Sequence, residues 1–398
     1  MRMRMKNQRV VVVWVLLLIG IIYLCTDRRT KYKDNVKALL AKDKLSTSTE
    51  GGQVRSLRDY YSYMEYHVNW KERNPEVFIN KSHPFFKDRS DPVCDHSFHD
   101  KFRDNVNTVL KYSFSGIEKY LEYLGLDDNG IHRLTIKNGA NDDVNETEIV
   151  IVTGTSSNHF AEFQGLVKNL RGTIFKQYKN VRLVFYNLGL TKSQLKRTIK
   201  YCNCEVRSFP IRKLPKHVSR PNTYAWKPVL IQLALKDFEQ IIYVDTSFRF
   251  SAKNSLNTYL ERSKMHGIQL PFDLRPVSTM TDERTFRFLG EEPCSFYGYT
   301  EAAAQIFIIS RSEFTLQAVI KPLLSCALQF GCMAHPREVS LLSCHFEKVM
   351  HACHRFDQSV IGIIITRIFN VRRDLVTIDL PEIGSVQRED KANIFPSH

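Results

Sequence analysis

The sequence lacks the motifs that assign a chain at once to one of the large enzyme classes. It has no GxxxxGKS/T phosphate loop and no GxGxxG fingerprint, so neither P-loop ATPase nor NAD chemistry is indicated. A Gly-x-Ser-x-Gly nucleophile elbow is also absent. There is no zinc-finger spacing, no aromatic RNA-binding signature and no long basic run, which argues against a nucleic-acid partner.

The positive charge of the chain is unevenly distributed. The formal net charge is +15, but residues 1–60 hold 13 Lys and Arg and 5 Asp and Glu, so more than half of the excess lies near the amino terminus. The remaining chain is modestly basic. Such a balance suits an anionic ligand such as a nucleotide.

Only one apolar run approaches the thickness of a bilayer. Residues 10–25 would span ~24 Å as a helix, with Arg and Lys on both sides. No small-residue cleavage site follows, so we interpret the run as an uncleaved signal anchor rather than a cleaved signal peptide. The predicted organisation is a cytosolic tail at 1–9, the transmembrane helix, a flexible stem at 26–90 and a luminal domain at 91–398. We therefore expect a single-pass type II protein of the Golgi or ER membrane.

The cysteines agree with that compartment. Eight of the nine follow the anchor, and an even number in an oxidising lumen favours disulfides, although their connectivity cannot be read from sequence. The alternative is a zinc site, for which the spacings are unlike those of known fingers. Asn80 and Asn145 each begin an N-glycosylation sequon, as expected for a luminal glycoprotein.

Apolar runs and amphipathic segments alternate through the middle of the chain. Strands are predicted at 148–153, 181–186, 205–209, 240–244 and 305–310. Helices are predicted at 92–125, after each of the first three strands, at 313–328 and from Gln358. Thr191, and Ser157 or Asn158, are candidate helix caps. This alternation predicts an α/β fold with a Rossmann-like, mostly parallel sheet flanked by helices.

The loop after the first predicted strand carries small and hydroxylated side chains. Thr153, Ser156 and Asn158 fall between that strand and its helix, where hydroxyl and backbone N–H groups can contact a phosphate or a sugar. A tight turn with a helix cap is the alternative. Ligands of open α/β sheets bind at the carboxyl ends of strands, so these residues are candidate ligand contacts.

A second candidate site lies at the end of the strand predicted at 240–244. Asp245 and Ser247 follow this apolar strand, where α/β enzymes hold a metal ion or a phosphate. Ser247 is the weaker ligand, so a metal would need a further ligand from elsewhere. Just before the preceding helix, Trp226 could stack on a base or sugar ring and Lys227 could meet a diphosphate. A core aromatic and a surface lysine are the alternatives.

A third candidate site precedes the last apolar helix, within 351–359. Asp357 is a candidate general base for an acceptor hydroxyl, and it is equally well placed to cap the helix. His354 is a candidate second metal ligand beside Asp245.

Three segments carry a resemblance to a known family. IVIVTGTSSNHFAEF, the segment at 224–250 and CHRFDQSV are similar to an uncharacterised family of single-pass membrane proteins, over roughly residues 90–385. That family in turn resembles GT-A glycosyltransferases, which carry an Asp-x-Asp motif on a Rossmann-like domain. By position, Asp245 matches the first Asp of that motif and Ser247 its third residue. Asp357 loosely matches a late acidic catalytic position.

The resemblance implies an activity and its partners. It implies transfer of a sugar from a nucleotide-sugar donor to a glycan or glycoprotein acceptor, with Mn²⁺ or Mg²⁺ as candidate cofactor. The nucleotide-sugar would contact Thr153, Ser156, Asn158, Trp226, Lys227, Asp245 and Ser247. A Golgi sulfotransferase is one alternative, but the loop at 153–159 lacks the Lys or Arg that its sulfonucleotide needs. A non-catalytic luminal binding protein on the same fold is the other.

Overall fold

The computed structural model describes residues 56–68, 70, 94, 98–136, 148–335, 344 and 353–396. The predicted cytosolic tail and anchor, together with both glycosylation sequons, lie outside these residues. Within the part of the chain that is described, no helix is both long enough and apolar enough to cross a bilayer.

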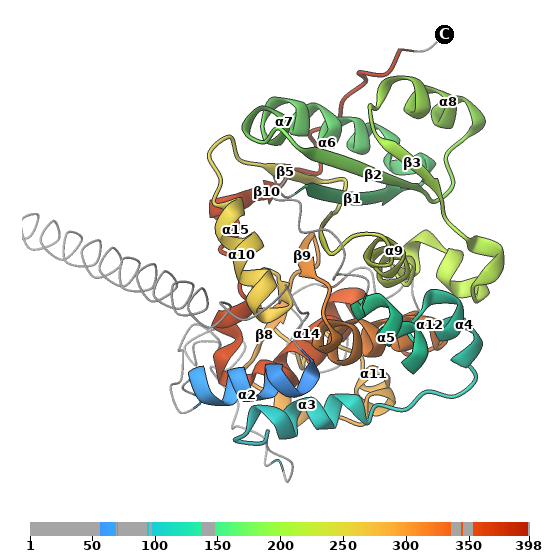
Figure 1. Cartoon of the computed structure of the whole chain (residues 1–398). Helices are drawn as coiled ribbons and strands as arrows, with labels where there is room; N and C mark the ends of the chain where they lie inside the picture. The colour runs from blue at the N-terminus through green and yellow to red at the C-terminus, as the bar shows by residue number, and fades with distance from the viewer. Residues whose placement is uncertain are drawn as a thin grey trace, which may run out of the picture. The chain divides into compact units, whose positions relative to one another are not determined.

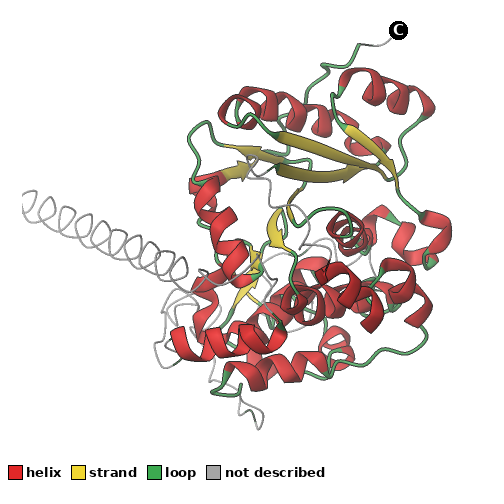
Figure 2. Ribbon diagram, in the orientation of Figure 1, coloured by secondary structure: helices red, strands yellow, loops and turns green. Residues whose placement is uncertain are grey.

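A six-stranded sheet organises the fold (Figures 1 and 2). Its order is β3-β2-β1-β4-β9-β6. The strands are β1 at Ile149–Thr155, β2 at Val181–Asn187, β3 at Glu205–Ser208, β4 at Gln240–Val244, β6 at Ile268–Gln269 and β9 at Ile306–Ser310. The first four are parallel, whereas β9 runs antiparallel to both β4 and β6. The prediction of an α/β fold with a mostly parallel sheet is confirmed.

Helices cover both faces of the sheet. Alternate side chains of β1 point to opposite faces. Ile151 joins a core with α6 (Phe160–Gly172), while Val152 joins a second core with α9 (Trp226–Leu235). Figure 1 shows α6 and α8 (Lys192–Tyr201) on one side of strands β1 to β3 and α9 on the other. The apolar stripe of α6 is fully buried: Phe160, Phe163, Leu166, Val167 and Leu170.

The amino-terminal helices pack on the carboxyl-terminal half. They are α2 at Leu57–His67, α3 at Phe102–Leu110, α4 at Glu118–Leu124 and α5 at Asp128–Ile136. Phe102 of α3 lies 5.8 Å from Tyr60 of α2 and 5.9 Å from Phe369, measured between ring centroids. Because α2 falls within the range predicted as a stem, the folded part of the chain includes residues ahead of position 91.

The carboxyl-terminal half is built from short elements. It contains two small antiparallel ribbons, which pair β5 (Phe248–Phe250) with β10 (Gly384–Val386) and β7 (Phe272–Pro276) with β8 (Thr300–Ala302). These strands were not predicted, because three to five residues show too little periodicity in the sequence. The helices of this half are α10 at Leu256–His266, α11 at Glu283–Phe288, a π-helical turn at Thr315–Ile320, α12 at Lys321–Leu328, α14 at Asp357–Phe369 and α15 at Leu380–Ile383. A further short helix, α7 at Ile174–Gln177, follows α6 in the first half of the chain.

The predicted helix caps had mixed outcomes. Thr191 is confirmed, because its hydroxyl accepts from the Gln194 N–H at 3.2 Å. The cap at Ser157 or Asn158 is wrong, since these residues form a 3₁₀ turn and α6 begins after His159. Asp357 is the first residue of α14 rather than its cap, and its carboxylate turns to another partner.

All eight cysteines after the predicted anchor are paired. The disulfides join Cys94 to Cys294, Cys202 to Cys204, Cys326 to Cys332, and Cys344 to Cys353. The prediction of disulfides is confirmed, and the pairing leaves none of these thiols for a zinc ion.

Candidate functional site

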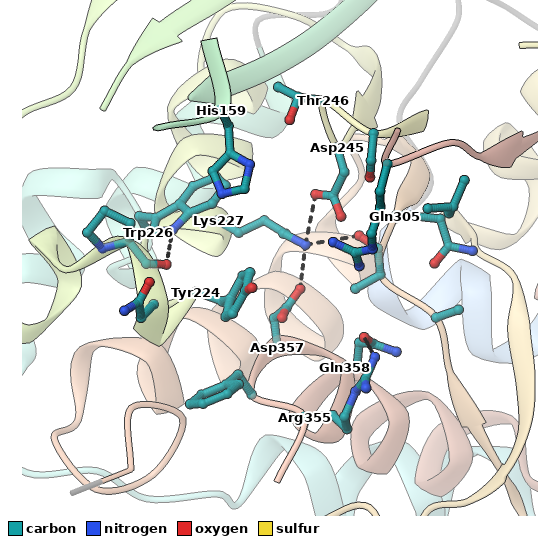
Figure 3. A pocket seen from close by; sticks show the side chains of 18 of the residues that line it. His159, Tyr224, Trp226, Lys227, Asp245, Thr246, Gln305, Arg355, Asp357 and Gln358 are labelled. Carbon is teal, nitrogen blue, oxygen red and sulfur yellow. Dashed lines mark hydrogen bonds and ion pairs between the residues drawn. The ribbon is translucent and has the colours of Figure 1, made fainter. Parts of the chain in front are cut away.

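A cavity of about 690 Å³ opens where the parallel strands end (Figure 3). The turns after β1 and β4, the first turn of α9, the segment ahead of β9 and the start of α14 all contribute to its wall. Its size is that of a typical ligand pocket, and its place is the one where open α/β sheets bind ligands. The residues that line it include Ser156, Trp226, Lys227, Asp245, Ser247, His354 and Asp357.

A buried lysine lies at the centre of the site. The Nζ atom of Lys227 is 3.1 Å from Oδ1 of Asp245 and 2.6 Å from Oδ2 of Asp357. It also donates to the carbonyl of Ala304 at 3.0 Å. Figure 3 shows the ammonium between the two carboxylates. The Lys227 side chain is 2% exposed, so this is an ion-pair cluster at the base of the cavity and not a surface lysine.

The charges of this cluster stabilise one another. Burial alone would lower the pKa of Lys227, but the carboxylates of Asp245 and Asp357 outweigh it and raise that pKa above its ordinary value. Burial raises the pKa of Asp357, and the nearby ammonium of Lys227 opposes this effect. The hydroxyl of Tyr243 donates to Oδ1 of Asp245 at 2.6 Å. Each charged group thus has a partner of opposite charge or a hydrogen-bond donor.

The backbone explains why Asp245 faces the cavity. Strand β4 ends at Val244, and the Asp245 N–H donates to the Gln305 carbonyl at 2.9 Å. The Asp245 carbonyl then accepts from the N–H of Phe248 at 3.0 Å, which closes the turn into β5. The Asp245 side chain remains 32% exposed, against 6% for Asp357, so it is the more accessible carboxylate.

A second polar cluster lines the cavity beside the turn after β1. Nδ1 of His159 lies 3.4 Å from Oε2 of Glu162, and the Thr246 hydroxyl donates to Oε1 of Glu162 at 2.6 Å. Burial would raise the pKa of Glu162, but the hydrogen bonds from His159 and Thr246 lower it. The hydrogen bond with Glu162 also raises the pKa of His159, against the effect of burial. An ionised Glu162 therefore favours a protonated His159.

Three arginines contribute to the cavity wall. Arg275 forms an ion pair with Asp273, and Arg355 donates to Oε1 of Gln358 at 3.0 Å. Arg388 is exposed and, among the described residues, no carboxylate pairs with it. Arg355 and Arg388 are therefore available to an anionic ligand.

The aromatic residues of the site are held by the turn ahead of α9. Tyr224 has a φ of 54°, a left-handed conformation that non-glycine residues adopt rarely and mostly in tight turns or functional loops. The next residue but one, Trp226, donates its indole N–H to the Pro221 carbonyl at 3.0 Å. Both rings line the cavity, as Figure 3 shows, and can pack against a planar base or a sugar ring.

Two of the predicted ligand contacts do not reach the cavity. Thr153 is buried within β1, where its hydroxyl donates to the Val244 carbonyl at 2.8 Å. Asn158 accepts from the Ser156 hydroxyl at 2.6 Å and is not part of the cavity wall. Both residues support the strand ends that shape the cavity.

The residues at the site do not fit a divalent cation. Three oxygen atoms converge, from Asp245, Asp357 and Ala304, but the Lys227 ammonium already lies among them. The ring nitrogens of His354 lie 3.0 Å from the Met333 carbonyl and 3.5 Å from the Asp282 N–H. Both ring nitrogens thus already have a backbone partner. The structure therefore does not make His354 a second metal ligand beside Asp245.

Sequence reasoning missed several residues of the cavity wall. His159 and Glu162 are three residues apart at the start of a predicted helix. Side chains at that spacing are neighbours on a helix, so their contact could have been predicted. Thr246 was not predicted as a site residue, although it lies between the candidate ligands Asp245 and Ser247. Arg388 gave no local signal, because only the pairing of β10 with β5 brings its segment to the cavity.

The comparisons with known proteins give one family match and several structural likenesses. Residues 96–232 match a family model described as "Protein of unknown function (DUF1647)". No curated protein sequence matches the chain.

The solved structures to which the chain is similar include glycosyltransferases. The bifunctional glycosyltransferase WbbM in its apo form is 13% identical with a TM-score of 0.33, and the match covers 61% of this chain but only 40% of WbbM. Core-mannan synthase A from Aspergillus fumigatus, in its Mn/GDP form, is 11% identical with a TM-score of 0.38 and coverage of 77% and 83%. Mouse xyloside xylosyltransferase 1, apo form, is 12% identical with a TM-score of 0.36 and coverage of 59% and 85%. These TM-scores are low, so we draw no functional conclusion from the likenesses.

Proposed function

We propose that this chain is a glycosyltransferase, which transfers a sugar from a nucleotide-sugar to a hydroxyl group of a glycan or glycoprotein. The observation that carries the proposal is the Lys227 ammonium held between Asp245 and Asp357 at the base of the cavity. A buried ion-pair cluster in a cleft, with strongly perturbed ionisation, is typical of a catalytic site. Its position at the carboxyl ends of parallel strands suits a nucleotide-containing substrate.

The remainder of the wall suits the two halves of such a donor. Trp226 and Tyr224 offer apolar ring surface for the base or the sugar. Arg388, which pairs with no carboxylate among the residues that the structure describes, offers its guanidinium for the diphosphate, and guanidinium groups bind phosphate oxygens in bidentate fashion. Bound in this way, the anomeric carbon of the sugar would face the two carboxylates.

The proposed reaction uses one carboxylate as a base. The bond between the anomeric carbon and the diphosphate oxygen breaks, and its electron pair stays with the departing diphosphate. The acceptor oxygen forms the new bond to that carbon, and its proton passes to Asp357. Burial raises the pKa of Asp357, which makes it a stronger base, while Lys227 keeps it ionised. Asp245 shares the ammonium and so holds Lys227 in place.

Turnover of a nucleotide-sugar panel by the purified full chain tests this proposal. We expect at least one donor to release its nucleoside diphosphate, and the release to be lost in Asp357→Asn. Asp374→Asn is the matched control, because that carboxylate pairs with Arg372 and does not line the cavity. Unchanged release in both Asp245→Asn and Asp357→Asn would overturn the assignment. Nucleotide binding without any turnover would instead identify a non-catalytic binding protein.

We also propose that the folded part lies in the lumen of the Golgi or ER, behind an anchor at residues 10–25. Four disulfides support an oxidising compartment. Protease protection of the chain in intact microsomes tests this topology. A chain that is digested fully without detergent would contradict it.

A further inference from the structure

Resting on the proposed function, we infer that the protein supplies its own cations at the diphosphate site, with Lys227 and Arg388 in the place of a divalent metal. A bound metal has two tasks at such a site. It neutralises the carboxylates that would otherwise repel the diphosphate, and it neutralises the diphosphate itself. The structure divides these tasks between the two side chains.

Lys227 performs the first task. Its ammonium contacts both carboxylates and a carbonyl at distances of 2.6 to 3.1 Å, within a fully buried position. A divalent cation entering here would have to displace the ammonium. The displaced charge would then be buried without a partner, which is strongly unfavourable. Lys227 thus excludes the metal as well as replacing it.

Ser247, at the third position of the segment that begins at Asp245, offers a metal ion no carboxylate. Its side chain is buried, and its carbonyl accepts from the Gln387 N–H at 2.8 Å. The backbone at position 247 thus anchors the carboxyl-terminal segment. That anchor brings the next residue, Arg388, to the cavity wall.

Arg388 performs the second task. Contacts on both sides of Arg388 hold its segment in place. On one side the Gln387 N–H donates to the Ser247 carbonyl, and on the other Asp390 forms an ion pair with Arg249 at 2.7 Å. Arg388 and the turn after β1 line the same cavity. Because Arg388 pairs with no carboxylate among the described residues, its full positive charge is available to a diphosphate.

Mn²⁺ binding to the purified full chain tests the first half of the inference without any assay of activity. We expect the EPR signal of free Mn²⁺ to be unchanged by the wild-type chain. Lys227→Ala should create a site, because two carboxylates and a carbonyl would then converge on an open space. Lys227→Ala combined with Asp357→Asn should lose that site. One tightly bound Mn²⁺ per wild-type chain, abolished by Asp245→Asn, would overturn the inference. If Lys227→Ala does not fold, the wild-type titration alone decides.

Affinity for UDP and GDP tests the second half. We expect the dissociation constant to be the same with EDTA and with Mn²⁺, and to rise roughly tenfold in Arg388→Gln through loss of one charge-assisted contact. Lys391→Gln is the matched control on the same segment, since its partner is Glu389 and it lies outside the cavity wall. Strong dependence on Mn²⁺, or equal effects of the two variants, would overturn the role of Arg388. If neither nucleotide binds, the proposed function fails, while the Mn²⁺ titration still decides whether Lys227 excludes a metal.

Discussion

The ammonium of Lys227 lies 2.6 Å from Oδ2 of Asp357, which ties the first turn of α9 to the first residue of α14. Both side chains are buried, at 2% and 6% exposure. The contact therefore lies in the core of the fold and also forms the base of the cavity. Stability and function should respond together when it is broken.

Loss of the Lys227 charge should destabilise the protein strongly. Lys227→Met leaves the buried Asp357 and the partly exposed Asp245 without their counter-ion, which should lower the free energy of unfolding by about 3–5 kcal/mol. Lys264→Met is the control, because Lys264 pairs with Glu261 in an exposed position, and it should change stability by less than about 0.5 kcal/mol. Urea unfolding measures both. Equal losses in the two variants would show that the buried cluster contributes no more than a surface pair.

Removal of the proposed base should act on kcat rather than on KM. Asp357→Asn keeps the size of the side chain but cannot accept the proton, so kcat should fall by roughly a hundredfold or more. Because burial raises the pKa of Asp357, the acidic limb of the wild-type rate profile should lie above the ordinary range of an aspartate. Steady-state kinetics across pH measure both effects. A fall in affinity with unchanged kcat would assign Asp357 to substrate binding instead.

The buried carboxyl of Glu301, in β8, should make stability depend on pH. Burial raises the pKa of Glu301 from 4.5 to about 8, against the opposing charges of Arg355 and Arg275. Between these values the folded protein keeps a proton that the unfolded chain releases, so the free energy of unfolding should fall as pH rises from about 4.5 to 8. Glu301→Gln should remove this slope, and the exposed Glu283→Gln should retain it. Thermal unfolding across pH measures the difference, and an unchanged slope in Glu301→Gln would contradict the assignment.

The disulfides should contribute to stability according to the loops that they close. Cys94 and Cys294 are 200 residues apart, and their loop predicts a loss of about 5 kcal/mol in the double Cys→Ser variant. Cys202 and Cys204 are 2 residues apart, and the same chain-entropy relation predicts only about 1.5 kcal/mol. Chemical denaturation of the two variants makes the comparison. A larger loss from the short loop would mean that the bond acts through the folded state and not through the entropy of the unfolded chain.

Much of the sheet could be predicted because its strands carry a local signal. Strand β1 is buried over its whole length, and β4 is an uninterrupted apolar run that stops at Asp245. Such runs predict central strands without any knowledge of their neighbours. The direction of β9 could not be predicted in the same way, because an apolar run is equally consistent with parallel and antiparallel pairing.

The role of Lys227 depended on contacts that no local pattern records. Its position at a helix start predicted a cation near a phosphate, with a surface lysine as the alternative. In the structure it is buried at the base of the cavity, where Asp357 reaches it from a distant part of the chain. The same limit applies to Arg388, whose place at the cavity follows from the pairing of β10 with β5.

The sequence by itself determined the α/β class, the carboxylate at the end of β4 and the formation of disulfides, but not which cysteines pair. These follow from apolar runs, from where they stop and from an even count, all of which are local or additive properties. Tertiary structure alone decided which charges meet. Lys227, Asp245 and Asp357 come from three separate segments, and their mutual stabilisation depends on distances that exist only after the chain has folded.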